Sequence, residues 1–373
     1  MAAKVESQIS DALFRLAVHS LNEKPCESAV VSPFSIAMAL ATVNAGAKGV
    51  TSLEITEAAF AGIPKNQITA WFRERITDLK EEGLSSPLAI ASAIYLERTL
   101  GLVERYQTEL QQSFDSRVHR VDFTLEPELQ REVMNMYVEG ATKGHISELF
   151  HEGDITSDTR IVAVNALYLK SNFAQEFEKE LTKEEPFYNE DGSNKQVPTM
   201  NGIKKGRFFE NDDFAYAEFP FMDCCFDFFF AVPKAGSLAE LKKNFYKTQH
   251  LISSTISDSE PIPYIHVALP KFKAEAGYSL KTALEKHGIR EMFVADKADL
   301  SGITDEPITV ESVIHQAVFD LNEDGVEASA ATAVMACGRC LELSQEERHI
   351  RADRPFLYGV IYKGAPLFVG QFY

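Results

Sequence analysis

The chain has 373 residues, of which 45% are hydrophobic and 25% charged, and its formal net charge is -18. This acidic balance excludes general nucleic-acid binding, which needs Lys and Arg side chains to neutralise phosphates. No linker, low-complexity tract or internal repeat divides the sequence, so we expect a single domain over residues 1–373.

Signals for export or for membrane insertion are missing from the sequence. No signal peptide is visible at the first residues, and no run of 18 apolar residues occurs, so we expect no membrane partner. There is no Asn-x-Ser/Thr site, and the five cysteines are an odd number, which argues against a disulfide framework. We therefore expect a cytoplasmic protein, and a monomer. An extracellular location stays open if a leader precedes the sequence given.

The first 150 residues predict mainly helices. Apolar residues at helical spacing predict an amphipathic helix over 7–22, and Ser32-Pro33 followed by an apolar run predicts a buried helix over 32–45. Further helices are expected at 51–60, 66–82, 104–114 and 127–141. Between them, the apolar run over 87–97 predicts a buried strand.

Strands dominate the remainder of the chain. Residues 160–170 form a nearly continuous apolar run, which indicates a strand that is buried on both faces. Further strands are expected at 207–219, 225–232, 262–273, 308–322, 356–363 and 366–372, together with one helix at 278–287. Because helices concentrate before strands, the fold class is predicted to be α+β rather than alternating βαβ.

Residues 323–340 are rich in small side chains and contain no proline. Every second residue from Val326 is small, and this set comprises Val326, Ala328, Ala330, Thr332, Val334 and Ala336. Strand side chains alternate between two faces, so this set could enter a protein core while the other set meets solvent. The absence of proline permits a central strand, and Gly325 supplies backbone freedom for a hinge. Composition alone also fits a flexible Ala-rich loop or a weak helix.

Several separated blocks of the sequence carry a resemblance to known proteins. They are Ser32-Pro33-Phe34-Ser35-Ile36, Gly46-Ala47-Lys48-Gly49, Thr142-Lys143-Gly144-His145-Ile146, Asn165-Ala166-Leu167-Tyr168-Leu169-Lys170, His315-Gln316-Ala317, Arg351-Ala352-Asp353-Arg354-Pro355-Phe356 and Leu367-Phe368-Val369-Gly370. Together these blocks resemble the serpin family of protease inhibitors over nearly the full chain. No single block identifies the family, but the presence of all of them in this order along the chain is highly specific for it. Tyr137 and Phe173 stand where the family has Trp, and both keep an aromatic ring.

The resemblance implies an α+β fold of three β-sheets and about nine helices, with residues 324–350 as an exposed reactive-centre loop. It also implies that a protease cleaves this loop and forms a covalent acyl complex, after which the upstream loop inserts into the main sheet. The loop hinge would be Glu323, Asp324, Gly325, Val326, Glu327, Ala328, Ser329, Ala330 and Ala331. A hydrogen-bonded shutter under the sheet would consist of Ser32, Ser35, Asn165 and His315, so His315 would be structural rather than a catalytic base.

The bait residue follows from the family's usual hinge length. Counting 17 residues from Glu323 inclusive gives Arg339, and the cleaved bond is then Arg339–Cys340. Arginine suits a trypsin-like serine protease, whose specificity pocket ends in a carboxylate. A shift by one residue would make Gly338 or Cys340 the bait and a papain-like cysteine protease the target. A non-inhibitory serpin, acting as a carrier or chaperone, is a further alternative.

Cys337-Gly338-Arg339-Cys340 is also a C-x-x-C motif, which in isolation indicates a thiol redox site. Such motifs normally open a helix, and no helix is predicted after this one. A Cys337–Cys340 disulfide would enclose Arg339, so oxidation could switch the inhibitor off. The nine histidines lack a paired metal-ligand spacing, so we expect no metal. We expect no other cofactor, and the resemblance implies a protease inhibitor rather than an enzyme.

Overall fold

The computed structural model describes residues 2–81, 88–222, 225–245, 260–311, 313–326 and 347–373. All six helices predicted up to residue 141 are present. The helices of the described residues are α1 (Ala2–Leu21), α2 (Pro33–Gly46), α3 (Gly49–Phe60), α4 (Lys65–Glu81), α5 (Glu104–Phe114), α6 (Pro127–Ala141) and α8 (Lys281–His287), with short 3-10 helices η1 (Lys179–Leu181) and η2 (Glu291–Phe293).

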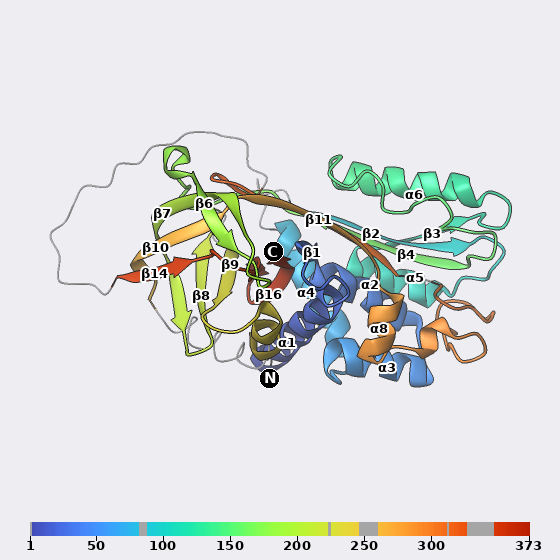
Figure 1. The fold of residues 1–373 in the computed structure, drawn as a ribbon. Helices are drawn as coiled ribbons and strands as arrows, with labels where there is room; N and C mark the ends of the chain where they lie inside the picture. Colours follow the sequence, from blue (N-terminus) through green and yellow to red (C-terminus); the bar gives the residue numbers. More distant parts are fainter. Residues whose placement is uncertain (1, 82–87, 223–224, 246–259, 312, 327–346) are drawn as a thin grey trace.

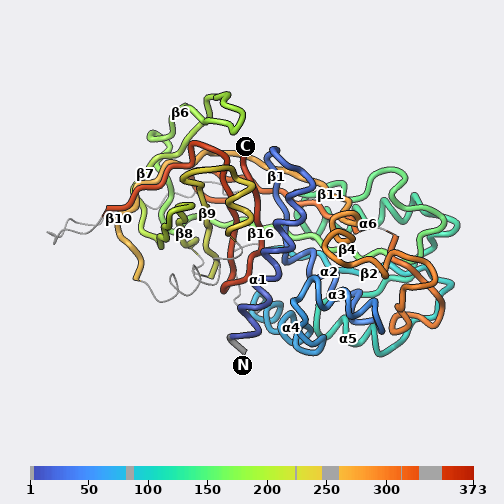
Figure 2. Tube along the Cα trace, turned by 60° about the horizontal axis from the view of Figure 1, so that its bottom comes forward, coloured from blue at the N-terminus to red at the C-terminus, as the bar shows by residue number. Residues whose placement is uncertain are grey.

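The largest sheet has the strand order β1-β16-β15-β9-β8-β7-β10-β14, and β6 pairs with β7 beside this path. Its strands are β1 (Ala29–Val31), β6 (Lys183–Tyr188), β7 (Asn194–Glu210), β8 (Phe214–Pro220), β9 (Phe226–Pro233), β10 (Ile262–Pro270), β14 (Arg348–Arg351), β15 (Phe356–Tyr362) and β16 (Ala365–Phe372). The two strands predicted at the end of the chain are confirmed, and they pair as the hairpin of β15 with β16. Figure 2 shows β16 beside β1 and α1, near the centre of the molecule.

Two smaller sheets extend from this body toward the helices (Figure 1). One has the order β3-β2-β4 and the other β11-β12-β13-β5. Their strands are β2 (Ala89–Glu97), β3 (Arg117–Val121), β4 (Ile161–Tyr168), β5 (Ser171–Asn172), β11 (Phe272–Ser279), β12 (Ile314–Leu321) and β13 (Gly325–Val326). The predicted α+β class with three sheets is confirmed.

Several strand predictions are wrong in extent. The segment 207–219 is a hairpin rather than one strand, because the side chain of Asn211 accepts hydrogen bonds from two backbone N–H groups and turns the chain. The segment 262–273 divides at Lys271 into β10 and β11, and α8 therefore begins at Lys281 rather than at 278. In the segment 308–322 the strand begins only at Ile314. The strands β3, β6 and β14 were not predicted, since they are short and largely polar.

Helices cover the two faces of the smaller sheets. Buried α2 packs against β4 and β16, and α6 lies across β2 on the opposite face (Figure 1). A separate hydrophobic cluster under α6 includes Val164 of β4 and Val318 of β12. Among the described residues, no helix combines the length and apolar character that crossing a membrane requires.

Candidate functional site

The start of α2 joins β4 to β12 through buried hydrogen bonds. Ser32 is the N-cap of α2, and its hydroxyl accepts a hydrogen bond of 3.1 Å from the Ser35 N–H. The Ser32 N–H donates to His315 Nε2 of β12 at 2.9 Å. The Ser35 hydroxyl donates to Asn165 Oδ1 of β4 at 2.6 Å. The structure thus brings together the four residues that the sequence predicted as a shutter.

His315 is neutral in this environment. Burial lowers the pKa of its imidazole from 6.5 to about 3, because no anion compensates for the lost solvation. Since Nε2 accepts a hydrogen bond, the proton of the neutral ring is on Nδ1. The buried Nδ2 of Asn165 has no hydrogen-bond partner among the described residues. A polar donor is therefore left unsatisfied between β4 and β12.

The strands β4 and β12 lie side by side without forming a ladder. Among the described residues, β4 pairs only with β2, and β12 pairs with β11 and β13. The two sheets are joined at one end, where β13 lies between β12 and β5. Val326 is opposite Leu321 on one side and Ser171 on the other, and both pairings are antiparallel. The chain after β12 has therefore already reversed its direction and entered the space between the sheets.

A tight turn and two ion pairs hold this reversal. The Lys271 ammonium lies 2.8 Å from the Glu323 carboxylate, and the Lys179 ammonium lies 3.1 Å from that of Asp324. The Thr182 hydroxyl donates a further bond to Glu323. Burial tends to raise the pKa of Glu323, but the bonds from Lys271 and Thr182 hold it below the ordinary value. Lys271, Lys179 and Thr182 were not predicted to take part in the hinge, because only tertiary packing brings them to it.

Gly325 adopts a backbone conformation that requires glycine. Its φ is +146°, and an added Cβ would lie 2.2 Å from the carbonyl oxygen of Ser171. The close approach of β13 to β5 therefore depends on the missing side chain.

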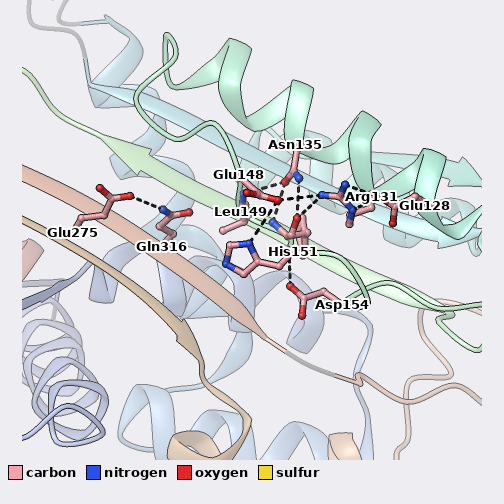
Figure 3. Close-up of polar contacts among 10 residues, drawn as sticks. Glu128, Arg131, Asn135, Glu148, Leu149, His151, Asp154, Glu275 and Gln316 are labelled. Atoms are coloured by element: carbon pink, nitrogen blue, oxygen red, sulfur yellow. Dashed lines mark hydrogen bonds and ion pairs between the residues drawn. The ribbon is translucent and has the colours of Figure 1, made fainter.

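The helix α6 and the segment after it cover the opposite face of the smaller sheets (Figure 3). Asn135 Oδ1 accepts hydrogen bonds from the N–H groups of Leu149 and Phe150, and its Nδ2 donates to the Phe150 carbonyl. Arg131 also donates to that carbonyl, at 2.8 Å. On the sheet below, Gln316 of β12 donates to Glu275 of β11. The segment after α6 is thus fixed to the helix by buried bonds.

The predicted loop falls largely outside the described residues. Glu327, Ala328, Ser329, Ala330, Ala331, Cys337, Arg339 and Cys340 lie in the undescribed range 327–346. At the two ends of the expected exposed loop 324–350, the structure shows strands instead. Asp324 and both residues of β13 are buried, and β14 begins at Arg348. The first residues of the expected loop are therefore buried, whereas Glu347 and His349 near its other end are exposed.

Comparison with known proteins identifies the family. Residues 7–373 match the family model described as "Serpin (serine protease inhibitor)". The chain is a serpin. Members of this family are generally inhibitors of proteases and not enzymes.

Relatives of this serpin cover nearly its whole length. It is 33% identical to Iripin-2 of Ixodes ricinus over 95% of this chain and 90% of that protein. It is 30% identical to the leukocyte elastase inhibitor of Equus caballus, over 98% of this chain and 99% of the relative. Among solved structures, Serpin48 of the insect Tenebrio molitor has the same fold, with a TM-score of 0.84 at 24% identity over 99% of this chain and 97% of the insect chain.

Proposed function

We propose that this serpin is a suicide-substrate inhibitor of trypsin-like serine proteases, cleaved at Arg339–Cys340. In this proposal the protease forms an acyl-enzyme with Arg339, and the loop upstream of the cut inserts between β4 and β12. The inserted segment would form a new strand that pairs with the open edge of β4 on one side and with the open edge of β12 on the other. We also propose that the protein acts as a monomer. We propose a cytoplasmic location, because five cysteines do not suggest the disulfide framework that is typical of secreted proteins.

The observation that carries the proposal is the position of β13. Each step forward along β13 moves one residue backward along both antiparallel neighbours. If the register continued from Val326 in the inserted state, Thr332 would lie opposite Asn165 of β4 and also opposite His315 of β12. By the same count, Ala336 would lie opposite Ile161, the first residue of β4. An inserted strand of this length would fill the space along β4.

The side chains fit this register. Residues directly opposite each other in a sheet share one face, so Thr332 would face the core side, as His315 does. Thr332 is the single polar residue of the small set on that face. Its hydroxyl would reach the level of Asn165, whose buried Nδ2 has no partner among the described residues. Insertion would thereby satisfy a polar group that costs roughly 1–3 kcal/mol when left unpaired.

The identity of the target rests on Arg339. A fixed guanidinium charge matches a specificity pocket that ends in a carboxylate. One relative is called a leukocyte elastase inhibitor, but a bait arginine would direct this chain to serine proteases of a different side-chain specificity. If Gly338 or Cys340 were the bait instead, a papain-like cysteine protease would be the target. A non-inhibitory member would be cleaved without trapping any protease.

Denaturing gel electrophoresis after mixing with trypsin tests the proposal. Wild type is expected to give a covalent complex, Arg339→Ala none, and Arg339→Lys a complex again, because trypsin-like pockets accept either cation. Thr332→Arg is expected to be cleaved without trapping, since a charge cannot enter the sheet interior cheaply, whereas Thr332→Ser should still trap. A trypsin complex with Arg339→Ala would show that the bait is assigned wrongly, and trapping by Thr332→Arg would exclude the proposed insertion register.

A further inference from the structure

Three potential metal ligands meet at the edge of the largest sheet, where β14 lies beside β10 (Figure 1). The two strands are parallel, and His266 is directly opposite His349. Their imidazole rings are stacked, with centroids 4.4 Å apart. Glu347 lies two residues before His349, and its Oε2 is 3.4 Å from His266 Nε2. One ring nitrogen from each histidine and one carboxylate oxygen all lie within 4.8 Å of one another.

This donor set has the chemistry of a zinc site. Zinc binds His nitrogen and carboxylate oxygen at about 2.0–2.2 Å in tetrahedral geometry, which separates neighbouring ligand atoms by roughly 3.3 Å. The His266–Glu347 distance of 3.4 Å already has this value, whereas the two stacked imidazole rings would have to rotate so that their in-plane nitrogen lone pairs converge on the metal. All three side chains are accessible to solvent, and a pocket of about 350 Å³ beside the histidines leaves room for water as a fourth ligand.

Charges around the cluster permit a cation there. The lining of this pocket includes Arg351, which lies on β14 two residues after His349. Arg351 forms an ion pair with Glu185, so its charge is offset. Among the described residues, no Lys or Arg forms an ion pair with the carboxylate of Glu347. Zinc binding would neutralise this carboxylate.

We propose that His266, Glu347 and His349 bind a divalent transition metal, best matched by Zn²⁺. Imidazole with carboxylate favours zinc over calcium or magnesium, which prefer all-oxygen sites. The metal would tie β14 to β10. Among the described residues β14 pairs with β10 alone, through four residue pairs, so this bridge would strengthen the attachment of an edge strand. The site is independent of the proposed inhibitory function. The spacing of histidines along the sequence could not predict this metal site, because His266 and His349 are far apart in the chain and meet only through the pairing of β10 with β14.

Equilibrium dialysis of the whole protein against micromolar ZnCl₂, followed by metal analysis, tests the site. We expect about one zinc per chain in wild type. His266→Ala and His349→Ala should each weaken binding by at least about tenfold, and the isosteric Glu347→Gln should weaken it too. Hydrogen exchange gives a second readout: zinc should slow exchange of the β14 amides in wild type but not in His266→Ala.

The matched control is His151→Ala. His151 is an exposed histidine whose Nδ1 lies 3.7 Å from Glu148, but within the part of the chain that the structure describes no third ligand joins that pair. This variant should bind zinc as wild type does. All the histidine variants keep the five cysteines, so undiminished binding in His266→Ala and His349→Ala would assign the metal to thiols and overturn the proposal. Absence of zinc binding to wild type would overturn it as well.

Discussion

His315 should make the stability of this protein sensitive to acid. The ring is fully buried, and its Nε2 accepts the Ser32 N–H at 2.9 Å. Burial lowers its pKa from 6.5 to about 3. The unfolded chain therefore takes up a proton near pH 6.5 while the folded protein does not. Stability is complete above this pH and decreases as the pH falls toward 3.

The size of the effect follows from the pKa difference. Each unit corresponds to about 1.4 kcal/mol, so the full loss approaches roughly 5 kcal/mol, with about 2–3 kcal/mol lost between pH 6.5 and 4.5. His315→Gln removes the titrating ring and keeps an oxygen that can accept the Ser32 N–H. We therefore expect the variant to lose less stability than wild type over this pH range, whatever its stability at neutral pH.

Thermal unfolding, followed through the fluorescence of the single tryptophan Trp71 in a series of buffers from neutral to acidic pH, measures this difference. His151→Gln is the control, because its side chain is largely exposed. His287 also has a pKa lowered to about 4 by burial, so some acid sensitivity should persist in His315→Gln. Parallel pH curves for wild type and His315→Gln would refute the reasoning.

Three further predictions concern the hinge, a buried acid and the loop cysteines. Gly325→Ala should destabilise the protein by at least about 2 kcal/mol in thermal or urea unfolding, because its Cβ would meet backbone atoms of β5; Gly277→Ala, with nothing within 4 Å, should cost much less. Burial and the nearby Asp227 raise the pKa of Glu218 to about 7. The protonated carboxyl therefore contributes stability in acid, and this contribution is lost as the pH rises through 7. Glu218→Gln should thus stabilise the protein by up to about 3 kcal/mol above pH 7, with a difference that vanishes toward pH 4.5. If a Cys337–Cys340 disulfide encloses Arg339, an oxidant should slow trypsin inhibition by wild type but not by Cys337→Ser; equal rates with the disulfide confirmed by mass spectrometry would exclude the switch.

The sequence predicted the helices better than the strands. The apolar spacing of α1 and the Ser32-Pro33 start of α2 are local features, so they could be read directly. The hairpin between β7 and β8 was missed because only the polar residues 211–213 interrupt a strand-like run. Short edge strands such as β14 carry little apolar signal, since their pairing rather than their composition forms them.

The candidate site likewise contains residues that the sequence could predict and residues that it could not. Ser32, Ser35, Asn165 and His315 were predicted from motif resemblance, and the structure brings them into hydrogen-bonding contact. The anchors of the hinge could not be predicted, because Lys179 and Lys271 meet their carboxylates only through tertiary packing. The early entry of β13 between β12 and β5 also depends on the register of both neighbours, which no single segment encodes.

The most direct test of the central claim is the mass of the peptide that is released when trypsin is trapped. Acyl transfer from Arg339 would leave residues 1–339 on the protease and break the covalent link to the peptide Cys340–Tyr373. Because this peptide contains β14, β15 and β16 of the largest sheet, it is recovered on denaturation. The account predicts that this peptide appears in step with the covalent complex under reducing conditions. A released peptide that begins at another residue, or cleavage at Arg339 without a trapped protease, would contradict it.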